Sequence, residues 1–160
     1  MPQVSVTRRY RFSASHRLHS SLFNDQQNLA AYGKCNNPFG HGHDYTLEVT
    51  VAGEPDPLSG RLVPLSRLDH YVQSGVLDGM AWRNLNADVP EFASLVPTTE
   101  NLAGVIAARL SSAWHVAFPE RVRFERIRIH ETRNNIFEAE APCVPRPASP
   151  ERSAQLQQSR

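Results

Sequence analysis

Alternating apolar and polar residues predict two strands in the first third of the chain. Residues 4–15 (VSVTRRYRFSAS) alternate with one short interruption, and His16 follows directly. Residues 43–53 (HDYTLEVTVAG) repeat the alternation and are rich in β-favouring residues. Because successive side chains of a strand point to opposite faces, both segments are typical of half-buried strands.

Two further strands are predicted near the C-terminal end. Residues 121–131 (RVRFERIRIHE) alternate, but their apolar positions change from even to odd numbers part-way along. One extra residue in a strand produces such a shift, so we predict a β-bulge near Glu125. A turn at Asn134-Asn135 then leads into the last predicted strand, residues 135–141.

Helical periodicity lies between these two pairs of strands. Residues 66–77 open with Ser66 as a candidate cap, and residues 98–114 follow Pro97 with a threonine cap and one apolar stripe. A further helical turn is predicted at residues 25–32. The order is ββααββ, which predicts an α+β fold: an antiparallel four-stranded sheet with two helices on one face.

Composition limits the domain count and the classes of ligand. A chain of 160 residues with 40% hydrophobic content supports one domain with its own core. We assign that domain to residues 1–141 and expect the proline-rich residues 142–160 to be a disordered tail. The 17 basic and 16 acidic residues nearly balance, so no global charge favours nucleic acid as a partner.

The sequence gives no indication of a membrane span, a secretory signal or a disulfide framework. No apolar run is long enough to span a membrane, and the first residues lack the apolar segment of a secretory signal, so we expect a cytoplasmic protein. Cys35 and Cys143 are more than a hundred residues apart and make a poor disulfide framework in a reducing compartment. Cys35 is therefore predicted to be a free thiol.

A candidate metal site lies at the start of the second strand. His41 and His43 are two residues apart, so a strand would present both imidazoles on the same side. If the first two strands pair, His16 supplies a third. Three neutral nitrogens leave one position open, which is the catalytic form of a zinc site. The alternative is that three of the seven histidines merely lie near turns, because this spacing also arises by chance.

Three other residues are candidates with ordinary alternatives. Cys35 lies in a polar turn (GKCNNP), where a nearby cation would make it a nucleophile or base, although free cysteine often serves as a small buried apolar residue. Glu100 would by default compensate a helix dipole. Glu131, at a strand end, would by default be solvated.

Five motifs together resemble the 6-pyruvoyltetrahydropterin synthase family, with matching order and spacing over about residues 4–141. Five residues separate Cys35 from His41, which favours the pyruvoyl branch over the 6-carboxytetrahydropterin synthases. The motifs are FSASHRL (12–18), GKCNNPFGHGHDY (33–45), NLNADVPEF (84–92), TTEN (98–101) and HETRNN (130–135).

The resemblance implies a fold, a reaction and roles for individual residues. It implies the tunnelling fold in a homohexamer, a dimer of trimers with sites between subunits, and conversion of 7,8-dihydroneopterin triphosphate to 6-pyruvoyltetrahydropterin with loss of triphosphate. His16, His41 and His43 would bind Zn²⁺, which acts as a Lewis acid, and Cys35 would be the base. Glu131 would anchor the pterin ring, with Thr99 and Glu100 in the same pocket.

One departure from the family pattern affects the expected mechanism. Family members carry an Asp-His pair that completes a proton relay with the cysteine, and an ungapped alignment puts Ala81 and Trp82 at those positions. Neither residue can move a proton, and the indole would leave less room for a triphosphate-bearing chain. Shifting the alignment to Leu77-Asp78 recovers an aspartate but leaves Gly79 in place of the histidine. Two histidines are candidate substitutes: His70, in the Asp69-His70 pair, and His130.

Three hypotheses follow from this departure. The first is a zinc-dependent synthase with an altered acid-base relay. The second is a divergent, aldolase-like zinc lyase that cleaves or rearranges the side chain of a smaller substrate. The third is a non-catalytic pterin-binding protein, against which the retention of Cys35 argues.

Overall fold

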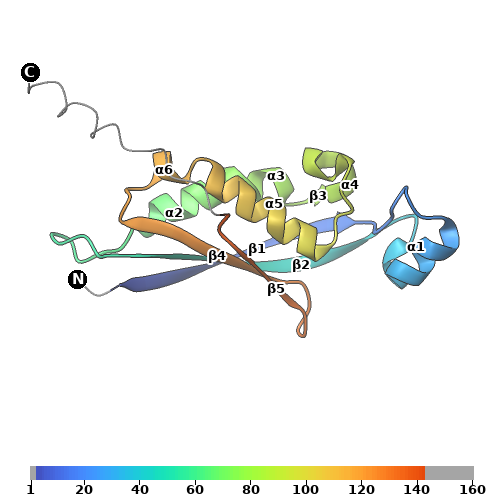
Figure 1. Cartoon of the computed structure of the whole chain (residues 1–160), viewed down its shortest axis with the longest axis horizontal. Helices are drawn as coiled ribbons and strands as arrows, with labels where there is room; N and C mark the ends of the chain where they lie inside the picture. The colour runs from blue at the N-terminus through green and yellow to red at the C-terminus, as the bar shows by residue number, and fades with distance from the viewer. Residues whose placement is uncertain (1–2, 143–160) are drawn as a thin grey trace, which may run out of the picture.

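The chain forms one sheet with helices on one of its faces. The computed structural model describes residues 3–142, and in this part the sheet has five strands in the order β3-β1-β2-β4-β5. Figure 1 shows α2, α3 and α5 lying along the same face of the sheet, with α1 beyond one end of the β1–β2 pair. The strands are β1 (Val4–His16), β2 (His41–Gly53), β3 (Arg83–Asn84), β4 (Val122–His130) and β5 (Ile136–Glu140), and the α-helices are α1 (Asp25–Tyr32), α2 (Leu65–Val72), α3 (Asp78–Met80), α4 (Leu85–Asp88), α5 (Thr99–Ser112) and α6 (Trp114–Ala117).

The long β1–β2 pair confirms the predicted pairing of the first two strands. The strands run antiparallel from Val4 opposite Gly53 to His16 opposite His41. Burial alternates along β1 and along β2 as far as Leu47, as the apolar alternation requires, and β2 is then buried on both faces from Glu48 to Gly53. The pairing fixes His16 beside the His-Gly-His segment at one end of the sheet.

The predicted bulge in β4 is present. Arg126 lies opposite Thr50 and Phe124 lies opposite Val51, so Glu125 has no partner residue on β2. The extra residue moves the buried positions of β4 from even to odd numbers, so Phe124, Ile127 and Ile129 all pack into the core.

The strand count of the prediction was wrong by one. Besides the four predicted strands, β3 pairs in parallel with β1, with Arg83 opposite Ala14 and Asn84 opposite Ser15. A strand of two residues is too short to show alternation, which is why the sequence pattern did not indicate it.

The helices confirm their predicted positions with one irregularity, but the expected cap Ser66 is wrong: α2 begins at Leu65 after Pro64 and has no side-chain cap. Thr98 caps α5, its side chain accepting a hydrogen bond from the Asn101 amide at 3.3 Å. The predicted helix over residues 66–77 is continuous but widens into a π-helical turn at Gln73–Leu77. Both helices pack leucine, isoleucine and valine side chains against β1, β2 and β4.

The face of the sheet without helices carries a charged group. Glu48 is 4% exposed and lies within ion-pair distance of Arg9 (2.8 Å), Arg128 (3.5 Å) and His130 (3.2 Å). The three cationic or titratable partners compensate the buried carboxylate. This face is therefore polar, in contrast to the apolar face under the helices.

The tail predicted at residues 142–160 lies outside the described residues from position 143 onward. Among residues 3–142, no helix has both the length and the apolar character needed to cross a membrane.

Candidate active site

Three histidines converge where β1 ends and β2 begins. One ring nitrogen from each of His16, His41 and His43 lies within 4.8 Å of the others, and Nε2 of His16 is 3.2 Å from Nε2 of His41. Two nitrogens bound to one tetrahedral zinc at about 2.0–2.1 Å would be roughly 3.3–3.4 Å apart. The cluster is therefore the right size for a single metal ion.

The surroundings of the cluster favour neutral imidazoles. Nδ1 of His16 lies 2.8 Å from the carbonyl oxygen of Pro97, which can only accept, so Nδ1 carries the proton and Nε2 has a free lone pair. Burial lowers the pKa of His16, which is 2% exposed, and burial also lowers the pKa of His41. Neutral nitrogens with lone pairs facing one another are what a metal ion requires.

A glycine allows the two strands to bring these histidines so close. Gly40 has φ +68°, a conformation that favours glycine, and a Cβ there would lie 2.8 Å from the carbonyl oxygen of His16. A side chain at position 40 would push His16 and His41 apart.

Glu131 lies directly beside the histidine cluster. Its Oε1 accepts a hydrogen bond from the hydroxyl of Thr99 at 2.5 Å and is 3.8 Å from Nε2 of His43. Thr99 is the buried first residue of α5, and Glu131 follows the last residue of β4. A helix start and a strand end thus hold one carboxylate at the edge of the candidate metal site.

Cys35 is a free thiol of intermediate exposure in the 3₁₀ turn Gly33–Asn36. Its carbonyl oxygen accepts a hydrogen bond from the amide of Leu18 at 2.8 Å. This bond ties the cysteine turn to the segment that directly follows His16.

Tyr45 is a site residue that the sequence reasoning missed. It is 1% exposed, its ring lies 5.5 Å from that of His43, and its hydroxyl has no hydrogen-bond partner among the described residues. Burial, and next the charge of Glu131, raise the pKa of Tyr45, and Cys35 adds a smaller effect. Its position two residues after His43 on a strand was the available signal, because such residues share a face.

Several other candidates lie away from this group. Glu100 is exposed, and it forms no side-chain hydrogen bond or ion pair among residues 3–142. Asp69 accepts hydrogen bonds from Arg8 (2.6 and 3.0 Å) and from Tyr10 (2.9 Å), which gives it a structural role, and His70 beside it is exposed.

His130 belongs to the opposite face of the sheet. It lies opposite Thr46, and its Nε2 is 3.2 Å from Glu48, without the alignment of a hydrogen bond. Residues of β2 with even numbers face away from His41 and His43. The geometry of a single chain thus gives neither His70 nor His130 access to the cluster.

The segment Ala81-Trp82 has an unusual backbone. Trp82 has φ +61°, its amide donates a 2.7 Å hydrogen bond to the carbonyl oxygen of Ser13, and its side chain is 85% exposed. The expectation that the indole reduces the room for a phosphate-bearing chain is therefore not met within one chain.

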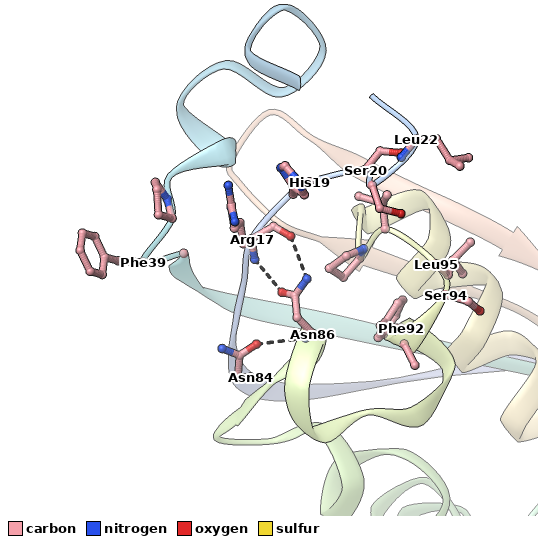
Figure 2. A pocket seen from close by; sticks show the side chains of 16 residues that line it. Arg17, His19, Ser20, Leu22, Phe39, Asn84, Asn86, Phe92, Ser94 and Leu95 are labelled. Atoms are coloured by element: carbon pink, nitrogen blue, oxygen red, sulfur yellow. Dashed lines mark hydrogen bonds between the residues drawn. The ribbon is translucent and has the colours of Figure 1, made fainter. Parts of the chain in front are cut away.

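A cavity of about 470 Å³ adjoins the histidine cluster. Figure 2 shows Arg17 and His19 on one side of it, with Asn84 and Asn86 below and Phe92, Ser94 and Leu95 opposite. Gly40 and Pro97, which contact His16, also line it. The cavity therefore lies next to His16, on the side of its backbone carbonyl and of Nδ1, and none of the three histidines lines it.

A family model described as 6-pyruvoyl tetrahydropterin synthase matches residues 5–142. The chain belongs to this family. Membership in the 6-pyruvoyl tetrahydropterin synthase family confirms the resemblance inferred from the five motifs, and it places the chain in a family of lyases.

Individual relatives agree with this membership. The chain is 44% identical to the 6-pyruvoyl tetrahydrobiopterin synthase of Homo sapiens over 134 residues, covering 84% of this chain and 89% of that one. The enzyme of the same name from Drosophila melanogaster is 39% identical over 141 residues, covering 88% and 82%.

Solved structures extend the comparison to the fold. The 6-pyruvoyl tetrahydropterin synthase of Caenorhabditis elegans superposes with a TM-score of 0.80 at 40% identity, covering 88% of this chain and 96% of that chain. The synthase of Plasmodium vivax shares the fold at 13% identity, with a TM-score of 0.63 and coverage of 87% and 98%. The α+β prediction and its assignment to the fold of this family are thus confirmed.

Proposed function

We propose that the protein is a zinc-dependent lyase of the 6-pyruvoyltetrahydropterin synthase type, acting on dihydroneopterin triphosphate or a related pterin. The observation that carries the proposal is the three-histidine cluster beside a threonine-bound carboxylate, in a chain of this family. His16, His41 and His43 would hold the ion, and when bound it supplies Lewis-acid polarisation of the substrate's side-chain hydroxyls.

Each remaining site residue has a proposed role. Glu131 binds the ring's adjacent N–H donors through its two oxygens, and Thr99 fixes the orientation of that carboxylate by its hydrogen bond to Oε1. Cys35 takes the side-chain proton as a general base. Glu100 is exposed, so it can contribute only at the rim of the pocket.

The acid-base relay of this enzyme is proposed to be altered. Ala81 and Trp82 stand where the family has Asp-His, and neither accepts a proton. Cys35 is partly exposed, so solvent can take up the proton it removes. General acid-base catalysis contributes about 10²- to 10⁴-fold in rate, so a correspondingly slower synthase is expected.

The altered relay also supports a second candidate function. A divergent, aldolase-like zinc lyase would use the same metal and base but cleave or rearrange a different side chain. A non-catalytic pterin-binding protein is less consistent with the retention of Cys35 in a polar turn. Incubation of the zinc-loaded protein with dihydroneopterin triphosphate, followed by mass analysis of the products, distinguishes the three functions.

We also propose an oligomeric state and a cellular location for the protein. β1 pairs with β3 only at Ala14 and Ser15, so the rest of its outer edge bears no strand among the described residues, and β5 forms the other edge. Unpaired edges can pair with further chains, so they are consistent with the homohexamer that the family resemblance implies. We further propose one domain at residues 1–141, a separate tail at 142–160 and a cytoplasmic location.

A further inference from the structure

The cavity beside the histidine cluster has a lining that suits an anion. Its lining contains two side chains that can be cationic, Arg17 and His19, together with three serines and two asparagines, and no aspartate or glutamate. Neither Arg17 nor His19 forms an ion pair with a carboxylate among residues 3–142. The two groups are therefore available to a ligand.

Arg17 and His19 are held together by a shared neighbour. Nε and Nη2 of Arg17 donate to the backbone and side-chain oxygens of Asn36 at 3.2 and 3.3 Å, and Nδ1 of His19 lies 3.0 Å from the same side-chain oxygen. A guanidinium has five N–H donors. Asn36 accepts one N–H from Nε and one from Nη2 of Arg17, so three N–H donors remain for a ligand.

The backbone of Arg17 is also fixed from below. The side chain of Asn86 accepts from the Arg17 amide at 2.8 Å and donates to its carbonyl oxygen at 3.0 Å, as Figure 2 shows. Asn84 in turn accepts from the amide of Asn86 at 3.0 Å. A cation with a fixed backbone loses little conformational entropy when it binds a ligand.

We infer that this cavity, the Arg17 pocket, binds the phosphate groups of the substrate's tail, with Arg17 and His19 as the cationic contacts. The inference rests on the proposed function, which identifies the rest of the substrate as a pterin ring with its side chain at the metal. Planar guanidinium groups match phosphate oxygens in pairs. The pocket lies next to His16 through Gly40 and Pro97, so a tail that leaves the metal and passes the His16 ring would enter it.

Two fluorescent, unreactive probes separate the tail from the ring: neopterin triphosphate and neopterin, each titrated into the zinc-loaded full chain by fluorescence polarisation. The zinc content is measured before and after each titration because triphosphate itself binds zinc. The variants are Arg17→Ala and His19→Gln. Arg61→Ala is the matched control, because Arg61 is exposed and lies in the loop after the far end of β2.

The expected result is tighter binding of neopterin triphosphate than of neopterin by the natural protein. Arg17→Ala should weaken neopterin triphosphate about ten- to a hundredfold, as loss of charge-assisted hydrogen bonds does, and His19→Gln should weaken it less. Neopterin affinity should stay within about twofold in both variants, and Arg61→Ala should change neither probe. His19→Gln serves as the test if Arg17→Ala fails to fold.

Equal affinity of the natural protein for both probes would overturn the inference, as would an equal loss for both probes in the Arg17 and His19 variants. Failure of the proposed function gives a different result. In that case neopterin does not bind at all, while inorganic triphosphate still binds in a manner that depends on Arg17.

Discussion

The hydroxyl of Thr99 and the carboxylate of Glu131 form a 2.5 Å hydrogen bond between the start of α5 and the end of β4. Since one lone pair of Oε1 is used by Thr99, the carboxylate has a fixed rotation and presents its remaining lone pairs toward the site beside His43. The bond thus orients a ligand-binding group through two rigid elements.

Replacement of Glu131 should remove recognition of the ring. We expect Glu131→Gln to weaken neopterin binding by about 1.5–3 kcal/mol, because the ring's N–H donors lose a charged acceptor. Thr99→Val should have a smaller effect in the same direction. Glu120→Gln is the control, since Glu120 is exposed and precedes the start of β4, at the opposite end of that strand from Glu131. Unchanged affinity in Glu131→Gln, measured by titration, would refute the anchoring role.

Metal analysis tests the histidine cluster. The protein should contain one zinc per chain, and His41→Ala should lose most of it, because two nitrogens hold zinc far less well than three. His115→Ala, in the short helix α6, should retain full zinc. Full occupancy in purified His41→Ala would show that the ion lies elsewhere.

The role of positions 81 and 82 can be tested by restoring the family residues. The Ala81→Asp, Trp82→His double variant should turn over dihydroneopterin triphosphate about 10²- to 10⁴-fold faster than the natural protein, because a proton relay is regained. Ala81→Ser, Trp82→Phe controls for the change of shape. If the natural protein already reaches about 1–10³ per second with no gain in the variant, Ala81-Trp82 is not a defect.

The Arg8–Asp69 pair predicts a pH-dependent contribution to stability. The hydrogen bond from Arg8 lowers the pKa of Asp69 below its ordinary value of 3.8. A carboxyl with a lowered folded-state pKa stabilises the fold above its unfolded pKa, and this contribution is lost as the pH falls through the folded value.

Asp69→Asn should therefore lower the Tm by a few degrees at pH 7, a small effect because the pair is partly exposed. The difference should shrink as the pH falls below the ordinary value of 3.8. Thermal denaturation of both proteins across pH 3–7 provides the measurement. A constant difference across this range would show that the asparagine acts through packing and not through charge.

The parts of the fold that were predictable from the sequence are those with many repeating positions. The 13-residue strands β1 and β2 and the 14-residue helix α5 show clear periodicity, and the shifted alternation of β4 located the bulge at Glu125. β3 could not be predicted, because two residues carry no period and its pairing with Ala14 depends on the intervening chain.

The site was predictable where strand geometry determined it. His16 was expected near His41 from the pairing of two strands, and the pair lies directly opposite. The contact of Thr99 with Glu131 joins residues 32 positions apart on different elements, and no local pattern encodes it. Trp82 is exposed and has a left-handed backbone, a conformation that is rare for a large residue and that the sequence does not signal.

The chain's two tryptophans lie in opposite environments, which has a spectroscopic consequence. Trp114 is 9% exposed, stacks on Phe118 at 4.2 Å and donates to the carbonyl oxygen of Val122, so its emission should report the integrity of the core. Trp82 is 85% exposed and should emit at longer wavelength. If another chain covered Trp82, the Trp82 emission should shift to shorter wavelength while the Trp114 emission stays constant. Tryptophan fluorescence would therefore detect this contact without any added dye.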